Sequence, residues 1–183
     1  MLLIDLIERE IDKIIKDFNT DPDIFLTEED VRCHLVSRFL KHKQFSQLSA
    51  TADDTQSIPI HTEVRWYGKN KNLKYRSDIV CFDTSSLRTK KELGLPSKGY
   101  VFDTFNAVIE LKLRRMNNRS DKKYISMIDE DFSKLKTLIR EVEDVKNARY
   151  YLLCFDKKKD ISSYLTKYRG DQRIDFRYIF KQS

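Results

Sequence analysis

The stretch Val108-Ile109-Glu110-Leu111-Lys112-Leu113 sets two charged residues among apolar ones. Side chains of a β-strand alternate between its two faces, so Glu110 and Lys112 share one face and the apolar residues share the other. Charge within a sheet is costly unless the charges are paired or hold a metal ion. A carboxylate and an ammonium group side by side therefore indicate either a site of chemistry or a structural ion pair.

A second acidic residue, Asp78, begins the apolar run Ile79-Val80-Cys81-Phe82. If this run is a strand beside the one that carries Glu110, two carboxylates and the Lys112 ammonium converge. Carboxylate and carbonyl oxygens are the ligands that Mg²⁺ and Mn²⁺ prefer. Such an ion can polarise a phosphodiester and activate a bound water, and a neighbouring lysine can orient that water or neutralise developing charge.

Hydrophobic periodicity predicts the elements that must position these residues. Apolar residues recur every three or four positions in the predicted helices and alternate or run together in the predicted strands. The predicted helices cover about 2–18, 28–43, 125–142 and 160–168, and the predicted strands cover 61–67, 75–82, 105–113, 149–155 and 174–180. Residues 46–57 are expected to be a loop, and residues 84–100 a long basic loop or extended hairpin.

This order of elements predicts a single α/β domain over residues 1–183, with a mixed central sheet flanked by helices on both faces. Helices over 2–43 precede a core over 60–155, and a helix and a strand follow over 158–180.

The hydrophobic-Glu-x-Lys strand, with an acidic residue on a preceding strand, resembles the PD-(D/E)xK nuclease superfamily. The resemblance covers about residues 27–155 and implies a restriction-endonuclease-like αβββαβ core with an extra N-terminal helix. It implies that Asp78 and Glu110 bind the metal, that the backbone carbonyl of Leu111 is a further ligand, and that Lys112 is the catalytic lysine. Ser77 stands where the motif has proline, and the spacing from Asp78 to Glu110 is long.

Two further glutamates could join such a site. Glu28 shares a helix face with Val31, Leu35 and Phe39 and could reach it, but we favour an exposed acid that interacts with the helix dipole. Glu63 could be a metal or water ligand, or a cross-strand partner of Arg76 or Lys74, and the sequence leaves both open.

Basic residues flank the expected site on both sides along the chain. Phosphate contacts from such residues supply much of the affinity for nucleic acid and make it depend on salt. Arg114 continues the polar face of Glu110 and Lys112 and is the first choice for a phosphate contact; the other candidates are Lys74, Arg76 and Arg115.

Composition agrees with this interpretation without requiring it. The formal net charge is +6, which favours polyanionic partners but also suits an ordinary basic surface. Three isolated cysteines, Cys33, Cys81 and Cys154, argue against a disulfide framework or a structural zinc site. No segment is apolar for the roughly 20 residues of a membrane span, so we expect a cytoplasmic protein without a membrane partner.

The sequence therefore predicts a Mg²⁺- or Mn²⁺-dependent nuclease, with DNA favoured over RNA as substrate, that could act as a homodimer. Two alternatives remain open. The chain could be a nucleic-acid-binding module without catalysis, or an interaction domain whose Glu110–Lys112 pair is structural.

Overall fold

The computed structural model describes residues 2–67, 73–89, 102–117, 119–141 and 148–182. Its centre is a five-stranded sheet of order β3-β4-β5-β6-β7, made of β3 (Ile60–Tyr67), β4 (Leu73–Phe82), β5 (Phe105–Arg114), β6 (Arg149–Asp156) and β7 (Ile174–Phe180). Strands β3, β4 and β5 pair antiparallel, whereas β5, β6 and β7 pair parallel. The sheet is therefore mixed, as the order of elements predicts.

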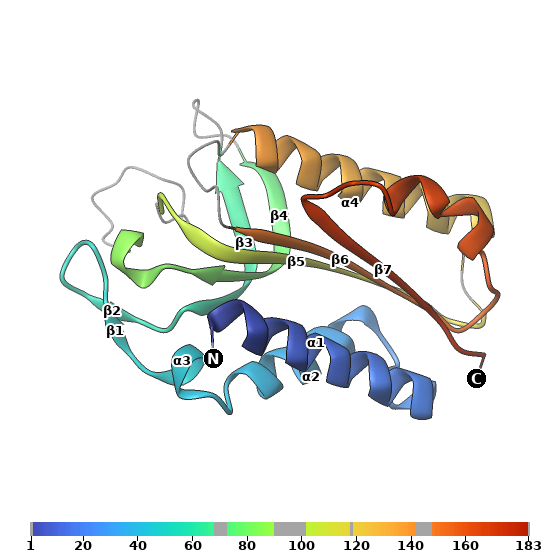
Figure 1. Ribbon diagram of the computed structural model, residues 1–183, viewed down its shortest axis with the longest axis horizontal. Helices are drawn as coiled ribbons and strands as arrows, with labels where there is room; N and C mark the ends of the chain where they lie inside the picture. Colours follow the sequence, from blue (N-terminus) through green and yellow to red (C-terminus); the bar gives the residue numbers. More distant parts are fainter. Residues whose placement is uncertain (1, 68–72, 90–101, 118, 142–147, 183) are drawn as a thin grey trace.

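Helices cover both faces of this sheet (Figure 1). On one face lie α1 (Leu3–Thr20) and α2 (Glu28–Phe39), and on the other lies α4 (Asp121–Glu141). The crossover from β5 through α4 to β6 joins two parallel neighbours, which is the usual use of a helical connection. The expected α/β class and the flanking helices are thus confirmed.

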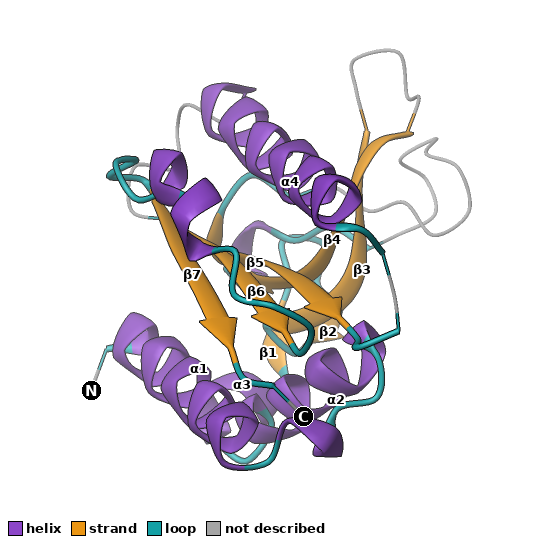
Figure 2. Cartoon of the chain, turned by 90° about the vertical axis from the view of Figure 1, so that its right-hand side faces the viewer, coloured by secondary structure: helices purple, strands orange, loops and turns teal. Residues whose placement is uncertain are grey.

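Each face of the sheet has its own hydrophobic core, formed with the helices that Figure 2 shows on that face. Ile79, Ile109 and Leu111 pack toward α1 and α2, whereas Val80 and Val108 pack toward α4. Ile179 of β7 belongs to the core on the α1 side, so the C-terminal strand and the N-terminal helix are parts of one packed layer.

Short elements connect the main ones. The 3-10 helices are η1 (Pro22–Ile24), η2 (Thr84–Ser86), η4 (Ser162–Tyr164) and η5 (Thr166–Tyr168), and the others are helix α3 (Lys43–Ser46) and strands β1 (Ser49–Ala50) and β2 (Gln56–Ser57). Residues 46–57, expected as a loop, thus include a two-stranded hairpin, and the helix expected over 160–168 is two 3-10 turns. The second helix ends at Phe39 rather than near 43.

The first long strand, β3, changes the face that its buried residues occupy. Ile60 belongs to the core on the α1 side, but Val64 and Trp66 belong to the core on the α4 side. The change of face coincides with Glu63, whose φ of 53° lies in the left-handed region. A non-glycine residue rarely adopts this conformation, so a local irregularity interrupts the period of two.

Residues 90–101, which hold most of the expected basic loop, lie outside the described residues. Among the helices that the structure describes, none is long and apolar enough to cross a membrane.

Candidate active site at the fork between two strands

The candidate site lies where β4 and β5 separate. Their pairing begins with Phe82 and Phe105 and ends with Ile79 and Ile109. Beyond this point β4 continues with β3, and β5 continues with β6, so the β3–β4 hairpin bends away from the sheet (Figure 1). The side of β5 that faced β4 is therefore left without a strand partner among the described residues.

Two carboxylates take the place of the missing strand. The backbone N–H of Leu111 donates to Asp78 Oδ2 at 2.8 Å, and that of Leu113 donates to Glu28 Oε2 at 3.3 Å. A buried N–H without a partner costs free energy, so these contacts help to stabilise the fork. They also bring Asp78 directly against the peptide of Leu111, next to Glu110.

Glu110 and Lys112 project from the face of β5 that α4 covers, opposite Ile109 and Leu111. Glu110 is 1% exposed, and its Oε2 accepts from Lys134 Nζ of α4 at 2.6 Å. Its other oxygen, Oε1, is buried with no hydrogen-bond partner among the described residues.

Lys112 is held at three points. Its Nζ lies 2.6 Å from Asp131 Oδ2 of α4 and 3.5 Å from Glu28 Oε1, and it donates to the carbonyl oxygen of Leu111 at 3.0 Å. Lys112 thus links β5 to a helix on each face of the sheet.

Burial and local charge alter the acidity of these groups. Burial raises the pKa of Glu110 to about 8; Lys134 opposes the rise, and Asp78 and Asp131 add to it. Burial also raises the pKa of Glu28, against the influence of Lys112. Burial alone would lower the pKa of Lys112, but the carboxylates of Asp131 and Glu28 hold it above its usual value.

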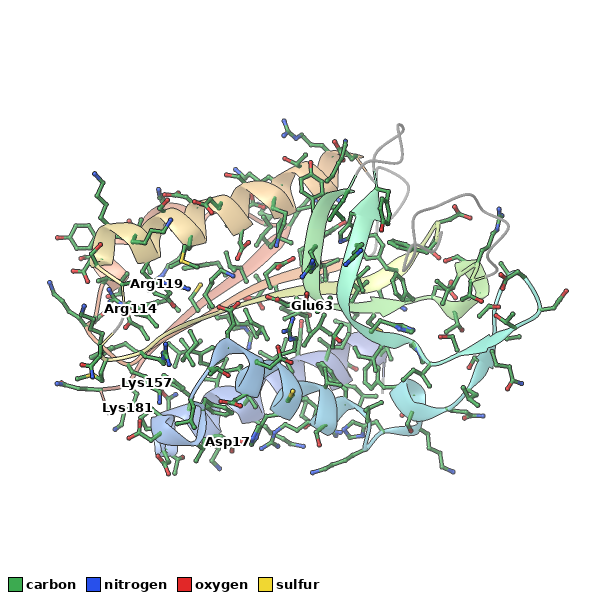
Figure 3. All side chains as sticks on the ribbon, turned by 180° about the vertical axis from the view of Figure 1, so that it is seen from behind. Asp17, Glu63, Arg114, Arg119, Lys157 and Lys181 are labelled. Atoms are coloured by element: carbon green, nitrogen blue, oxygen red, sulfur yellow. The ribbon has the colours of Figure 1, made fainter. Side chains whose placement is uncertain are left out.

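Asp78 has a cationic neighbour from α2. Arg32 Nη1 lies 3.3 Å from Asp78 Oδ1, and the same guanidinium pairs with Glu63 and Glu29. Glu63 also accepts from Arg76 at 2.8 Å. Figure 3 shows Glu63 on β3. Glu63 lies opposite Asp78 in the register, between the pairs Thr62–Ile79 and Val64–Ser77.

The structure shows the partners of the two further glutamates. Glu28 reaches the site through Leu113 and Lys112, so our preference for an exposed first-turn acid was wrong. Glu63 has the cross-strand partner Arg76, as one of its two alternatives predicts. This pairing leaves the proposed role as a ligand untested.

Sequence reasoning missed Arg32, Asp131 and Lys134. A signal for Asp131 is visible in the sequence. The buried residues of α4 are Tyr124, Ile128, Phe132, Leu135, Leu138 and Ile139. Asp131 follows Ile128 by three positions and precedes Leu135 by four, so it lies on this buried face of the helix beside Phe132. A charge at such a position indicates a polar partner on the sheet. No comparable signal marks Arg32.

The predicted phosphate contacts have different outcomes. Arg76 is half exposed and pairs with Glu63, and Lys74 pairs with Glu141 at the surface. Arg115 is exposed and is in no ion pair with the described residues. All three positions remain open to solvent, so their proposed contacts with nucleic acid stay predictions.

The prediction for Arg114 was wrong. Its side chain is 0% exposed, and its Nε donates to Asp156 Oδ1 at 2.9 Å while Nη1 pairs with Asp121. The N-terminal turn of α4 covers it, and its guanidinium lies 4.9 Å from the ring centroid of Tyr124. Figure 3 shows Arg114 well apart from Glu63 along the molecule. Arg114 therefore anchors the sheet instead of meeting solvent.

The fork contains two carboxylates and a carbonyl oxygen, the donor types that a hard divalent cation prefers. In the part of the chain that the structure describes, no three His, Cys, Asp or Glu side chains are grouped so as to hold a metal ion. The expected set needs only two carboxylates, of Asp78 and Glu110, and the carbonyl oxygen of Leu111. The partnerless Oε1 of Glu110 is a buried acceptor that such an ion would satisfy.

Comparison with models of known protein families, with curated proteins and with solved structures yields no match for this chain. The functional assignment therefore depends on the chemistry of the site.

Proposed function

We propose that this protein is a metal-dependent nuclease of the PD-(D/E)xK type that hydrolyses phosphodiester bonds, in DNA rather than RNA. The observation that carries the proposal is the fork itself. Asp78 contacts the peptide of Leu111. Glu110 and Lys112, the residues before and after Leu111, project together from the α4 face of β5. Two carboxylates, a carbonyl oxygen and an ammonium group are thus gathered at a place where the sheet opens.

In this proposal Asp78, Glu110 and the Leu111 carbonyl hold Mg²⁺ or Mn²⁺. The bound ion would polarise the scissile phosphate and lower the pKa of a water. Lys112 orients that water or neutralises negative charge that develops on the phosphate. Asp131 and Glu28 hold the Lys112 ammonium in place and in its charged form. Arg76, Lys74 and Arg115 would contact phosphates along the substrate.

Because two carboxylates keep Lys112 charged, we assign it the stabilisation of negative charge on the phosphate in preference to the role of a general base. A general base must be deprotonated, whereas its neighbours favour the protonated amine.

A second candidate function follows from the ion pairs. Arg32 pairs with Asp78, Lys134 pairs with Glu110, and Asp131 pairs with Lys112. A cluster in which each charge has a partner can also serve structure alone. In that case the protein is a binding module for nucleic acid or protein that uses the same fold without cleavage.

The test is cleavage of labelled single-stranded, double-stranded and branched DNA and of RNA, with Mg²⁺, with Mn²⁺ and with chelator. Wild type is compared with Lys112→Ala and Asp78→Asn. The matched controls are Lys43→Ala and Asp103→Asn, which change exposed residues away from the fork. Metal-dependent cleavage that both site variants lose and both controls keep supports the nuclease.

Other results favour the second candidate. Binding of nucleic acid that depends on salt, without cleavage under any metal condition, would indicate a binding module. Equal cleavage by wild type and Lys112→Ala would exclude the proposed site. Sedimentation of the active protein would test the expected homodimer. In this proposal one fork cuts one strand, so cleavage of both strands of a duplex needs two forks.

A further inference from the structure

Two adjoining hollows lie on the side of α4 that faces β7. Lys134 of α4 reaches β4 and β5, but Lys136 reaches Asp171 in the turn before β7, two strands further across the sheet. The first hollow, of about 480 Å³, lies between α4 and this turn. The second, of about 280 Å³, lies at the starts of β6 and β7. They share Asp171 and Arg173 and are separate from the fork.

The Asp171 carboxylate is occupied in shaping the turn. Its Oδ1 accepts from the backbone N–H of Arg173 at 3.0 Å, and its Oδ2 lies 3.6 Å from Lys136 Nζ. These contacts hold the turn against α4, so that Arg173 stands between the two hollows.

Four arginines line the hollows without an acidic partner in the described parts of the chain. Arg140 lines the first, Arg149 and Arg169 line the second, and Arg173 lines both. None of the four forms an ion pair with the described residues. Within the same part of the chain, their one side-chain hydrogen bond runs from Arg140 Nη2 to Thr137 Oγ1 at 3.2 Å. Exposed guanidinium groups gathered in this way favour an anion and repel one another without it.

The acidic residues of the lining do not neutralise all four arginines. Asp171 is paired with Lys136, and Asp175 is paired with Arg177, which lies outside the hollows. Glu8 accepts from the neutral hydroxyl of Tyr151 at 3.3 Å, so it keeps its charge and offsets one of the four arginines. Among the described residues of the lining, the positive side chains therefore outnumber the negative ones.

A buried donor points to the same ligand chemistry. Tyr150, which lines the second hollow, is 1% exposed, and its hydroxyl has no hydrogen-bond partner among the described residues. Burial raises the pKa of Tyr150. The positive charge of Arg173 opposes this rise, because its guanidinium lies close enough to act on the phenol. A buried hydroxyl without a partner is costly, so an acceptor oxygen in the hollow would stabilise it.

We propose that these two hollows form a binding site for a ligand that carries two or more phosphate groups. Arg173 lies between the phosphates, Arg140 contacts one from α4, and Arg149 and Arg169 contact another from the starts of β6 and β7. The hydroxyl of Tyr150 donates to a phosphate oxygen in the second hollow. Bidentate contacts of arginine with phosphate supply both strength and geometry. The site does not depend on the nuclease function proposed for the fork.

The experiment is titration calorimetry of the full chain with inorganic pyrophosphate, which carries the charge without a base or sugar. Wild type is compared with Arg173→Gln, Arg140→Gln and Tyr150→Phe. Lys43→Gln, an exposed lysine on α3, is the control for the loss of one positive charge. We expect Arg173→Gln to weaken binding about tenfold, Arg140→Gln and Tyr150→Phe to weaken it several-fold, and Lys43→Gln to leave it unchanged. Thermal unfolding of each variant without ligand checks that the fold is intact.

Equal pyrophosphate binding by wild type, Arg173→Gln and Lys43→Gln would overturn the proposed site, because binding would then come from general surface charge. The absence of binding to wild type in low-salt buffer would also overturn it. The natural source of the phosphates is tested by competition with a nucleoside diphosphate and with a short single-stranded oligonucleotide. Stronger competition by the diphosphate identifies a nucleotide, and stronger competition by the oligonucleotide identifies a nucleic-acid backbone. Either result supports the site if Arg173→Gln weakens the binding of that competitor.

Discussion

At the scale of single residues, the fork is defined by charges that meet where they cannot all be solvated. Glu110 is buried beside Lys134, and Asp78 meets Arg32. A metal ion at Asp78 and Glu110 would have to coexist with these two cations or displace them. The affinity of the site for metal should therefore depend on residues that are not themselves ligands.

Arg32→Leu should tighten Mn²⁺ binding about fivefold or more. The change removes a positive charge 3.3 Å from Asp78 Oδ1, and like charges repel strongly at such a distance in a partly buried site. Titration calorimetry with Mn²⁺ measures the effect. Arg38→Leu, on the same helix but paired with Asp17, is the control and should leave the affinity unchanged. Weaker metal binding in Arg32→Leu would contradict the proposed metal site.

The acidity of Glu110 predicts how stability changes with pH. The folded pKa of about 8 lies above the ordinary value of 4.5, so the folded protein keeps a proton that the unfolded chain releases. In chelator, the free energy of unfolding should fall as pH rises from 5 to 8, by at most about 1.4 kcal/mol per pH unit from this group. Urea unfolding across this range measures the slope, and Glu110→Gln should flatten it. The same slope in both proteins would show that Glu110 is not the group responsible.

At the scale of elements, the site is a product of helix placement. Thr27 begins α2, since its hydroxyl accepts from the N–H of Asp30 at 3.1 Å and its own N–H donates to Asp30 Oδ2 at 2.8 Å. This cap fixes the first turn, in which Glu28 accepts from the N–H of Leu113 on the side of β5 that β4 has left. On the other face, Asp131 and Lys134 sit one turn apart on α4 and meet Lys112 and Glu110.

Thr27→Ala should lower the free energy of unfolding by about 1 kcal/mol, the ordinary effect of removing a helix cap. Because the same turn carries Glu28, the change should also loosen the contact with Leu113, visible as faster amide exchange at Leu113. Thr27→Ser keeps the hydroxyl and should restore both properties. An unaltered exchange rate in Thr27→Ala, together with the loss of stability, would separate the cap from the site.

At the scale of the whole molecule, a buried network of polar contacts stabilises the end of the sheet where β5, β6 and β7 finish. Arg114 of β5 pairs with Asp156 at the end of β6 and with Asp121 at the start of α4. Asp156 also accepts from the hydroxyl of Tyr178 of β7 at 2.8 Å. One guanidinium thus connects three strands and a helix, directly or through one carboxylate.

Arg114→Ala should lower the free energy of unfolding by about 3–5 kcal/mol, because Asp156 would remain buried without its partner. Its exposed neighbour provides the contrast: Arg115→Ala should change stability by less than about 0.5 kcal/mol. Urea unfolding measures both. If Arg114→Ala lowered the free energy of unfolding by less than about 1 kcal/mol and also weakened the binding of nucleic acid, the result would favour the predicted phosphate contact of Arg114 over the structural role.

Periodicity in the sequence predicted the strands and the main helices well, because residues close along the chain determine which faces are apolar. It also placed Glu110 and Lys112 on one face of β5. It failed where neighbours along the chain were poor guides, as at Glu63, where a left-handed backbone changes the face of the strand. The short hairpin of β1 and β2 likewise depends on pairing between polar segments that carry no apolar pattern.

The sequence by itself determined the order of elements, the mixed α/β class and the chemistry available on β5, since each depends on local pattern. Only the tertiary structure decided which charges meet. It brought Arg32, Asp131 and Lys134 to the site, turned Glu28 inward, and enclosed Arg114 between α4 and β6. These partners lie far apart along the chain, and no local pattern specifies a contact that forms only when helices close over both faces of a sheet.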